Sequence, residues 1–94
     1  MDKPLIVVNF KTYETAMGDS ALTLAKAMDN FTDRDFRMIA VVSAFDLSTI
    51  SNSVSSVEVW SQHLDPVGKG SHTGWLEPDL ALHHGAVGTI INHA

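Results

Sequence analysis

An amide and an ammonium side chain stand two residues apart near the N-terminus, where a short apolar run ends. The run is Leu5 to Val8, and Asn9 and Lys11 follow it with Phe10 between them. If the strand continues, alternation places the two polar side chains on one side and Phe10 on the other. The ammonium would then balance a phosphate or a developing enolate charge, and the amide would orient an oxygen. The alternative is that the strand ends at Val8 and both residues lie in a solvated loop.

A histidine near the C-terminus occupies the corresponding place after a second apolar run. His93 follows the run Gly88 to Ile91, with Asn92 beside it. The carboxyl ends of parallel strands meet at the same edge of a sheet, where α/β proteins bind ligands. His93 and Lys11 are therefore predicted to share that edge. The alternative is an exposed histidine at a frayed chain end.

Residues 62–75 carry side chains of the types that bind metals. They include Gln62, His63, Asp65 and His72. His and Asp are zinc ligands, but this spacing matches no established metal motif. We therefore predict a hydrogen-bonded loop here, with no metal site.

Strand and helix patterns alternate around these residues. Strands are expected at 5–8, 36–42, 57–61 and 86–92, and helices at 14–30, 46–54 and 78–84. The helix at 14–30 is indicated by apolar residues at spacings of three and four. A strand-helix alternation of this kind predicts right-handed crossovers and a parallel sheet, which suits an open doubly wound sheet or part of a barrel. No Gly-x-Gly-x-x-Gly follows any strand, so dinucleotide binding is disfavoured.

Composition narrows the class of protein. The 94 residues are 45% hydrophobic and 18% charged, which is typical of one small globular domain. The formal net charge is −5, with no basic run of the kind that nucleic-acid binding requires. The chain has no cysteine, which excludes a disulfide framework and a thiolate metal site. No apolar run reaches the length of a signal or membrane-spanning segment, so we expect a cytoplasmic protein without membrane contact.

Three motifs give the chain a resemblance to a known family. They are Val8-Asn-Phe-Lys-Thr-Tyr13, then Gln62-His63-x-Asp65 followed by Gly70-Ser-His-Thr-Gly74, and finally Gly85-Ala-Val-Gly-Thr-Ile-Ile-Asn-His93. In this order they resemble the first part of a triosephosphate isomerase of the compact archaeal type. The resemblance covers essentially the whole chain. It implies an α/β fold that is the N-terminal portion of a (β/α)₈ TIM barrel, with residues 1–94 forming a partial barrel domain that stops before the later strands.

The resemblance also implies an activity and the residues that serve it. The reaction is the interconversion of dihydroxyacetone phosphate and glyceraldehyde 3-phosphate, without metal or organic cofactor. Asn9 and Lys11 match the substrate-binding pair, and Lys11 would also help to stabilise the enediolate. His93 matches the neutral imidazole that polarises the substrate carbonyl, for which this enzyme family is an established example. Thr73 matches the tip of a loop that reaches into a neighbouring subunit, which implies a homo-oligomer, dimer or tetramer.

The chain departs from the family pattern in three places. The family continues past the histidine with Ser-Glu-Arg, whereas Ala94 ends the sequence, so the glutamate that pairs with the strand-one lysine has no counterpart in these residues. The general base lies later still in the family, and we therefore expect the fragment to be inactive alone. After the second strand the family often has Ala-Pro-Gln, where this chain has Val42-Ser-Ala-Phe-Asp46. Trp75 stands where the family often has an acidic residue.

Two other functions remain open at this point. One is a non-catalytic truncated or split half-barrel that acts by association with a partner chain through its open sheet edges. The other is a different phosphate-binding barrel enzyme, which the Gly-Ser-His-Thr-Gly loop at 70–74 disfavours.

Overall fold

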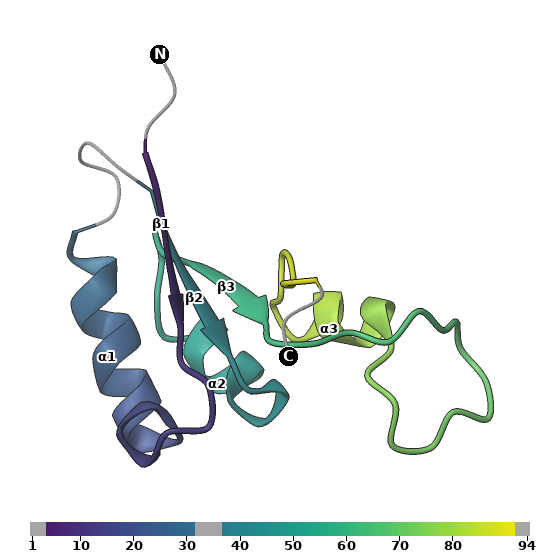
Figure 1. The fold of residues 1–94 in the computed structure, drawn as a ribbon. Helices are drawn as coiled ribbons and strands as arrows, with labels where there is room; N and C mark the ends of the chain where they lie inside the picture. Colours follow the sequence, from purple (N-terminus) through teal and green to yellow (C-terminus); the bar gives the residue numbers. More distant parts are fainter. Residues whose placement is uncertain (1–3, 32–36, 92–94) are drawn as a thin grey trace.

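A computed structural model describes residues 4–31 and 37–91 of the chain. Three strands form a parallel sheet in the order β1-β2-β3: β1 (Leu5–Asn9), β2 (Arg37–Val42) and β3 (Glu58–Ser61). Three α-helices alternate with them: α1 (Asp19–Asp29), α2 (Leu47–Ser51) and α3 (Pro78–His83). Two short 3-10 turns are η1 (Glu14–Ala16) and η2 (Ala44–Asp46). The strand-helix alternation and the parallel sheet expected from the sequence are confirmed for these elements (Figure 1).

The sheet places alternate residues on two faces. Val8, Ala40 and Val59 lie in register across the three strands. They join one hydrophobic cluster with Ala25 of α1 and Ile50 of α2, so this face is the one that the helices cover. Small residues on α1 let the helix approach the sheet closely, and burial of such apolar surface drives this packing at about 25 cal/mol per Å². The opposite face of the sheet carries the next row of paired residues, which begins with Asn9 on β1.

Helix α1 begins later than the sequence pattern predicted. We expected a helix from Glu14, but Glu14–Ala16 form a 3-10 turn and the α-helix starts at Asp19. The reason is Gly18, whose φ of 58° lies in the left-handed region that an α-helix does not use. Met17, which the pattern placed on the buried face, is 43% exposed.

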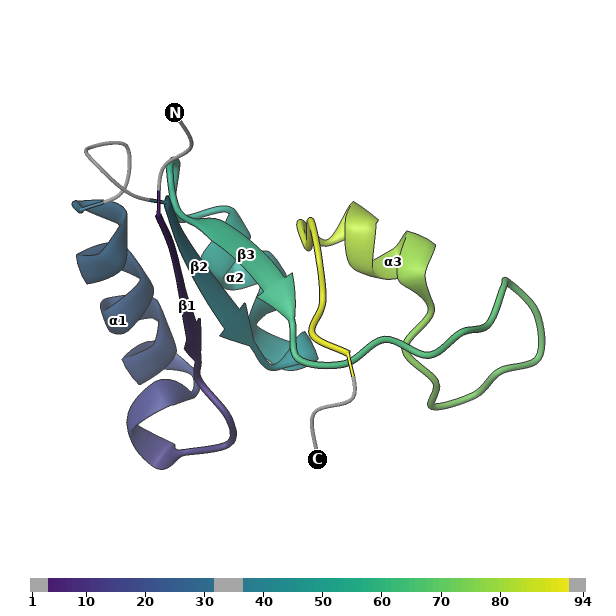
Figure 2. The ribbon, with the colours of Figure 1, turned by 45° about the horizontal axis from the view of Figure 1, so that its top comes forward.

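The prediction of a regular fourth strand at 86–92 is wrong for the described part of that segment. This segment runs beside β3 (Figure 2) but forms one isolated parallel bridge, between Ser61 and Thr89. Two backbone bonds of 3.0 Å hold it, from Val87 N–H to Val59 and from Ser61 N–H to Gly88. The Thr89 hydroxyl then donates to the Ser61 carbonyl at 2.9 Å, so a side chain occupies the acceptor that a longer ladder would use.

A long loop connects β3 to α3 and projects from the rest of the molecule (Figures 1 and 2). Asp65 and Leu76 close its base, because the Asp65 N–H donates to the Leu76 carbonyl at 2.8 Å. Helix α3 then begins with Pro78 at its first position, as predicted. Gly85 follows its end with a φ of 99°. Within residues 4–31 and 37–91, no helix has the length and apolar character needed to cross a membrane.

Candidate functional site

Two polar side chains, one from β1 and one that follows β3, bond to the backbone of Lys11 at the carboxyl edge of the sheet. The Asn9 side-chain oxygen accepts the Lys11 N–H at 2.9 Å. The Gln62 side-chain amide, which follows β3, donates to the Lys11 carbonyl at 2.7 Å. We call Asn9, Lys11 and Gln62 the lysine cluster. It lies where parallel α/β sheets place ligands.

Lys11 has an unusual backbone conformation. Its φ is 54°, in the left-handed region, which costs a residue with a Cβ about 1–2 kcal/mol. Phe10, immediately before it, is buried and donates its N–H to the Val41 carbonyl at 2.9 Å. The chain therefore turns sharply between a fixed residue and an exposed one. The strand ends at Asn9, so strand alternation does not determine the direction of the Lys11 side chain, contrary to the expectation for a strand that continues to Lys11.

The Lys11 side chain is exposed, and its ammonium lies 5.6 Å from the centre of the Tyr13 ring. A cation over an exposed aromatic face gains about 0.5–1 kcal/mol. The ion pairs found among residues 4–31 and 37–91 are Arg37–Glu58, His63–Asp65 and Lys69–Asp79. Lys11 belongs to none of these pairs. The contact with Tyr13 stabilises the Lys11 ammonium only weakly, so the ammonium is available to bind an anion.

A groove of about 520 Å³ lies beside the lysine cluster and includes Gln62 in its wall. Ser43 and Phe45 line it from the loop after β2, and His63 and Gly74 from the long loop. Phe45 is 98% exposed, at a position where the sequence departs from the family pattern. The groove therefore joins the loops after β2 and β3 at the same edge as Lys11.

The side chains considered as metal ligands instead make hydrogen bonds in the long loop. His63 Nε2 lies 2.8 Å from Asp65 Oδ1, and the other Asp65 oxygen accepts the Leu76 N–H at 2.7 Å. The Leu76 N–H, and then the His63 contact, lower the pKa of the Asp65 carboxyl below its ordinary 3.8. His72 bonds separately to the Gly68 carbonyl at 2.9 Å. The prediction of a hydrogen-bonded loop is confirmed, and no cluster of three or more His, Cys, Asp or Glu suited to a metal occurs in the described part of the chain.

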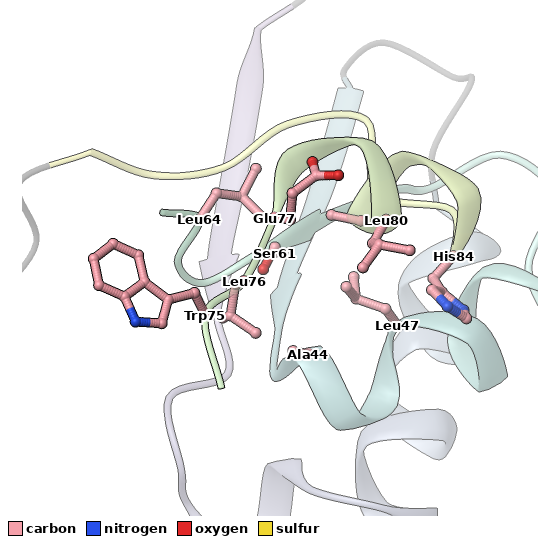
Figure 3. Close-up of a pocket in the computed structure, with 10 residues that line it drawn as sticks. Ala44, Leu47, Ser61, Leu64, Trp75, Leu76, Glu77, Leu80 and His84 are labelled. Atoms are coloured by element: carbon pink, nitrogen blue, oxygen red, sulfur yellow. The ribbon is translucent and has the colours of Figure 1, made fainter. Parts of the chain in front are cut away.

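A smaller cavity of about 120 Å³ lies between α2, α3 and the returning arm of the long loop (Figure 3). Its wall is mostly apolar and is formed largely by Leu47, Leu64, Leu76 and Leu80. Figure 3 shows His84 at one end and Trp75 at the other. His84 is tied to Ser48 by a bond of 2.6 Å between Nδ1 and Oγ. Neither Asn9 nor Lys11 lines this cavity, so it is separate from the lysine cluster.

The structure places the predicted site residues in different surroundings. Asn9 and Lys11 are brought together as a hydrogen-bonded pair. Thr73 is exposed on the projecting loop. His93 lies outside the described residues, so its predicted place beside Lys11 stays a prediction. The contact between Gln62 and Lys11 was not predicted, although both residues follow parallel strands and the shared carboxyl edge could have indicated it.

Comparisons with known proteins identify relatives of the chain. A sequence model of the family described as triosephosphate isomerase matches residues 4–94. Over 91 residues the chain is 40% identical to the triosephosphate isomerase of Archaeoglobus fulgidus, covering 96% of this chain and 40% of that protein. It is 38% identical to the triosephosphate isomerase of Methanothermus fervidus, covering 100% of this chain and 42% of the relative.

The solved structures agree on the fold. The crystal structure of triosephosphate isomerase from Bartonella henselae aligns with a TM-score of 0.80 and 24% identity, over 98% of this chain and 38% of that one. The chain thus corresponds to part of a TIM barrel and spans about 40% of the length of the curated relatives that it matches. With the family model covering residues 4–94, the chain belongs to the triosephosphate isomerase family.

Proposed function

We propose that this chain supplies the first part of a triose-phosphate isomerase, which interconverts dihydroxyacetone phosphate and D-glyceraldehyde 3-phosphate. The observation that carries the proposal is the exposed Lys11 ammonium at the carboxyl edge of the sheet, outside the ion pairs of the described residues, in a chain of this family. A phosphorylated triose is a small anion, and a lysine presents the point charge that such an anion requires.

The proposed chemistry is proton abstraction next to a carbonyl. Lys11 would balance the substrate phosphate and the negative charge that develops on the enediolate, which is an electrostatic stabilisation of the transition state. Asn9 fixes the backbone of Lys11 and so contributes to substrate binding indirectly. His93 would polarise the carbonyl. No step in this scheme requires a metal or an organic cofactor.

The wider assignments follow from the same proposal. Residues 1–94 would be a partial TIM-barrel domain, and the whole protein would act in glycolysis and gluconeogenesis in the cytoplasm. Its partners would be the triose substrate and further copies of itself, with Thr73 in the subunit interface. Nucleic-acid and membrane partners are not part of the proposal.

We expect the 94-residue chain alone to turn over no substrate, because it spans about 40% of its relatives and the family's general base has no counterpart in it. Loss of such a base costs about 10²–10⁴ in rate. The test is a coupled isomerase assay together with a titration of dihydroxyacetone phosphate followed by NMR. Lys11→Ala should abolish the substrate-induced shifts, whereas Lys26→Ala, an exposed lysine on α1, should not. Equal binding by the Lys11→Ala variant would refute the proposal.

A second candidate function has its own observation. Within the described residues β1 pairs with β2 alone, and its Leu5, Ile6 and Val7 are 49%, 40% and 46% exposed. Such an edge favours pairing with another chain. A half-barrel that acts by association would therefore be oligomeric in analytical ultracentrifugation, and Ile6→Lys would shift it to monomer. A monomer at all concentrations would exclude self-association through this edge.

A further inference from the structure

We propose that Gln62 is a positioning residue, which holds the backbone of Lys11 in its left-handed conformation and thereby places the ammonium for anion binding. The anion-binding half of this inference rests on the proposed function. The structural half rests on the bond from Gln62 Nε2 to the Lys11 carbonyl at 2.7 Å, between residues 51 apart in the sequence.

The first step is that the Lys11 conformation needs support from its surroundings. A non-glycine residue at a φ of 54° persists where neighbouring contacts determine it, and such residues cluster at functional sites. The Asn9 side chain supplies one contact, which ties the Lys11 N–H to the end of β1. That contact leaves the Lys11 carbonyl to be held by another part of the sheet.

The second step is that Gln62 is anchored independently of that turn. Its N–H donates to the Val42 carbonyl at 3.1 Å, which continues the pairing of β3 with β2. Ser61, just before it, is 1% exposed, and its hydroxyl donates to the His63 carbonyl at 2.7 Å. A fixed backbone on both sides gives the Gln62 side chain a defined origin. Its amide therefore ties Lys11 to a rigid part of the sheet.

The third step is geometric. The strand order is β1-β2-β3, so the Gln62 side chain reaches from the end of β3, past the end of β2, to the turn after β1. The bond uses an amide N–H as donor, and a carboxylate of almost the same size cannot donate. The bond therefore depends on the amide donor, which two variants of nearly the same length can remove, one with an apolar side chain and one with a carboxylate.

The test is NMR spectroscopy of the labelled 94-residue chain. Gln62→Met removes the donor and keeps the length, and Gln62→Glu removes it at neutral pH with almost no change of shape. Ser43→Ala is the matched control, because Ser43 Oγ accepts the Phe45 N–H at 3.3 Å in the neighbouring loop and makes no bond to Lys11. Three readouts are followed: the strong Hα–HN nuclear Overhauser effect within Lys11 that marks a positive φ, the ring-current shift that Tyr13 imposes on the Lys11 ε-methylene, and the dissociation constant for inorganic phosphate.

We expect both Gln62 variants to lose the Lys11 nuclear Overhauser effect and its ring-current shift, and Ser43→Ala to keep both. Phosphate binding should weaken by about two- to tenfold in Gln62→Met, the range that one hydrogen bond of ordinary net strength supplies. If Gln62→Met does not fold, the Gln62→Glu spectrum decides the question. An unchanged Lys11 signature in a folded Gln62 variant would overturn the inference, as would a lost signature with unchanged phosphate affinity. A wild-type chain whose Lys11 signals ignore phosphate would instead contradict the proposed function, and the Lys11 signature would still decide whether Gln62 fixes the backbone.

Discussion

Asp29 makes the clearest single contribution to holding the helical layer on the sheet. It is the last residue of α1, and its carboxylate accepts backbone N–H groups from the segment that leads into β3. Asp29 Oδ1 receives the N–H of Ser56 at 2.7 Å and of Val57 at 2.8 Å, and Oδ2 that of Ser55 at 3.1 Å. A negative charge at a helix C-terminus is unfavourable by itself, so these bonds must offset that cost.

The magnitude follows from how exposed each bond is. The bonds from Ser56 and Val57 are partly buried, and the bond from Ser55 is exposed. Counting the two partly buried bonds at about 1–1.5 kcal/mol each, Asp29→Ala should lower the free energy of unfolding by about 2–3 kcal/mol. Asp29→Asn keeps one side-chain oxygen as a neutral acceptor and should lose about half as much.

The contribution also depends on pH. Burial acts to raise the pKa of the Asp29 carboxyl, but the N–H groups of Val57, Ser56 and Ser55 outweigh it and lower the pKa below the ordinary 3.8. A pKa that is lower in the folded state means stability that is fully present above the unfolded value of about 3.9 and is lost as the pH falls through the folded value. The stability difference between wild type and Asp29→Ala should therefore shrink below about pH 4.

The assay is urea denaturation followed by circular dichroism at pH 7, with Lys26→Ala as an exposed control on the same helix. The expected order of stability is wild type, then Asp29→Asn, then Asp29→Ala, with a fall in Tm on the order of 10–20 °C for the last. The control should stay within about 0.5 kcal/mol of wild type. An Asp29→Ala variant as stable as the control would refute the reasoning.

Three further perturbations test other parts of the structure. Lys11→Gly should be about 1 kcal/mol more stable than Lys11→Ala in urea denaturation, because alanine keeps the left-handed strain that glycine relieves; equal stability would contradict the φ of 54°. Gly85→Ala should lower Tm, because a Cβ there would lie 1.9 Å from Ser51 Oγ and the φ of 99° disfavours a side chain; Ser51→Gly should restore part of the loss, and no change in Tm would argue against this close approach. Asp65→Asn should lower the hydrogen-exchange protection factor of the Leu76 amide and speed proteolysis of the long loop. In wild type the same protection factor should fall as the pH falls through the pKa of Asp65, which is lowered below 3.8; an unchanged protection factor would show that this carboxylate does not close the loop.

The strands were predictable because they follow the simplest rule. A strand of a parallel sheet reads as an apolar run, as Leu5 to Val8 and the residues of β2 do, although only β2 is largely buried in the described residues. The start of α1 was not predictable from periodicity. Met17 fits the helical spacing, so the helix was expected from Glu14, but Gly18 has a φ outside the α-helical region. A glycine inside a helical pattern signals either a tolerated residue or a boundary, and spacing alone does not separate the two.

The location of the candidate site was predictable from the sequence, but the hydrogen bonds within it were not. The carboxyl-edge rule located Lys11, yet the turn at Lys11 and its bond to Gln62 depend on which strands become neighbours. Such long-range contacts follow from the assembled sheet rather than from local pattern. The fourth strand was overpredicted for a related reason, since an apolar run becomes a regular strand where it has a backbone ladder to join.

A chimera can show whether these residues work as the first part of a triose-phosphate isomerase. The 94-residue chain would replace the matching 40% of the Archaeoglobus fulgidus triosephosphate isomerase, and the purified chimera would be assayed for isomerase activity. We expect turnover that Lys11→Ala and His93→Gln abolish and that Lys26→Ala preserves. A folded chimera without activity, or one whose activity survives Lys11→Ala, would contradict this expectation.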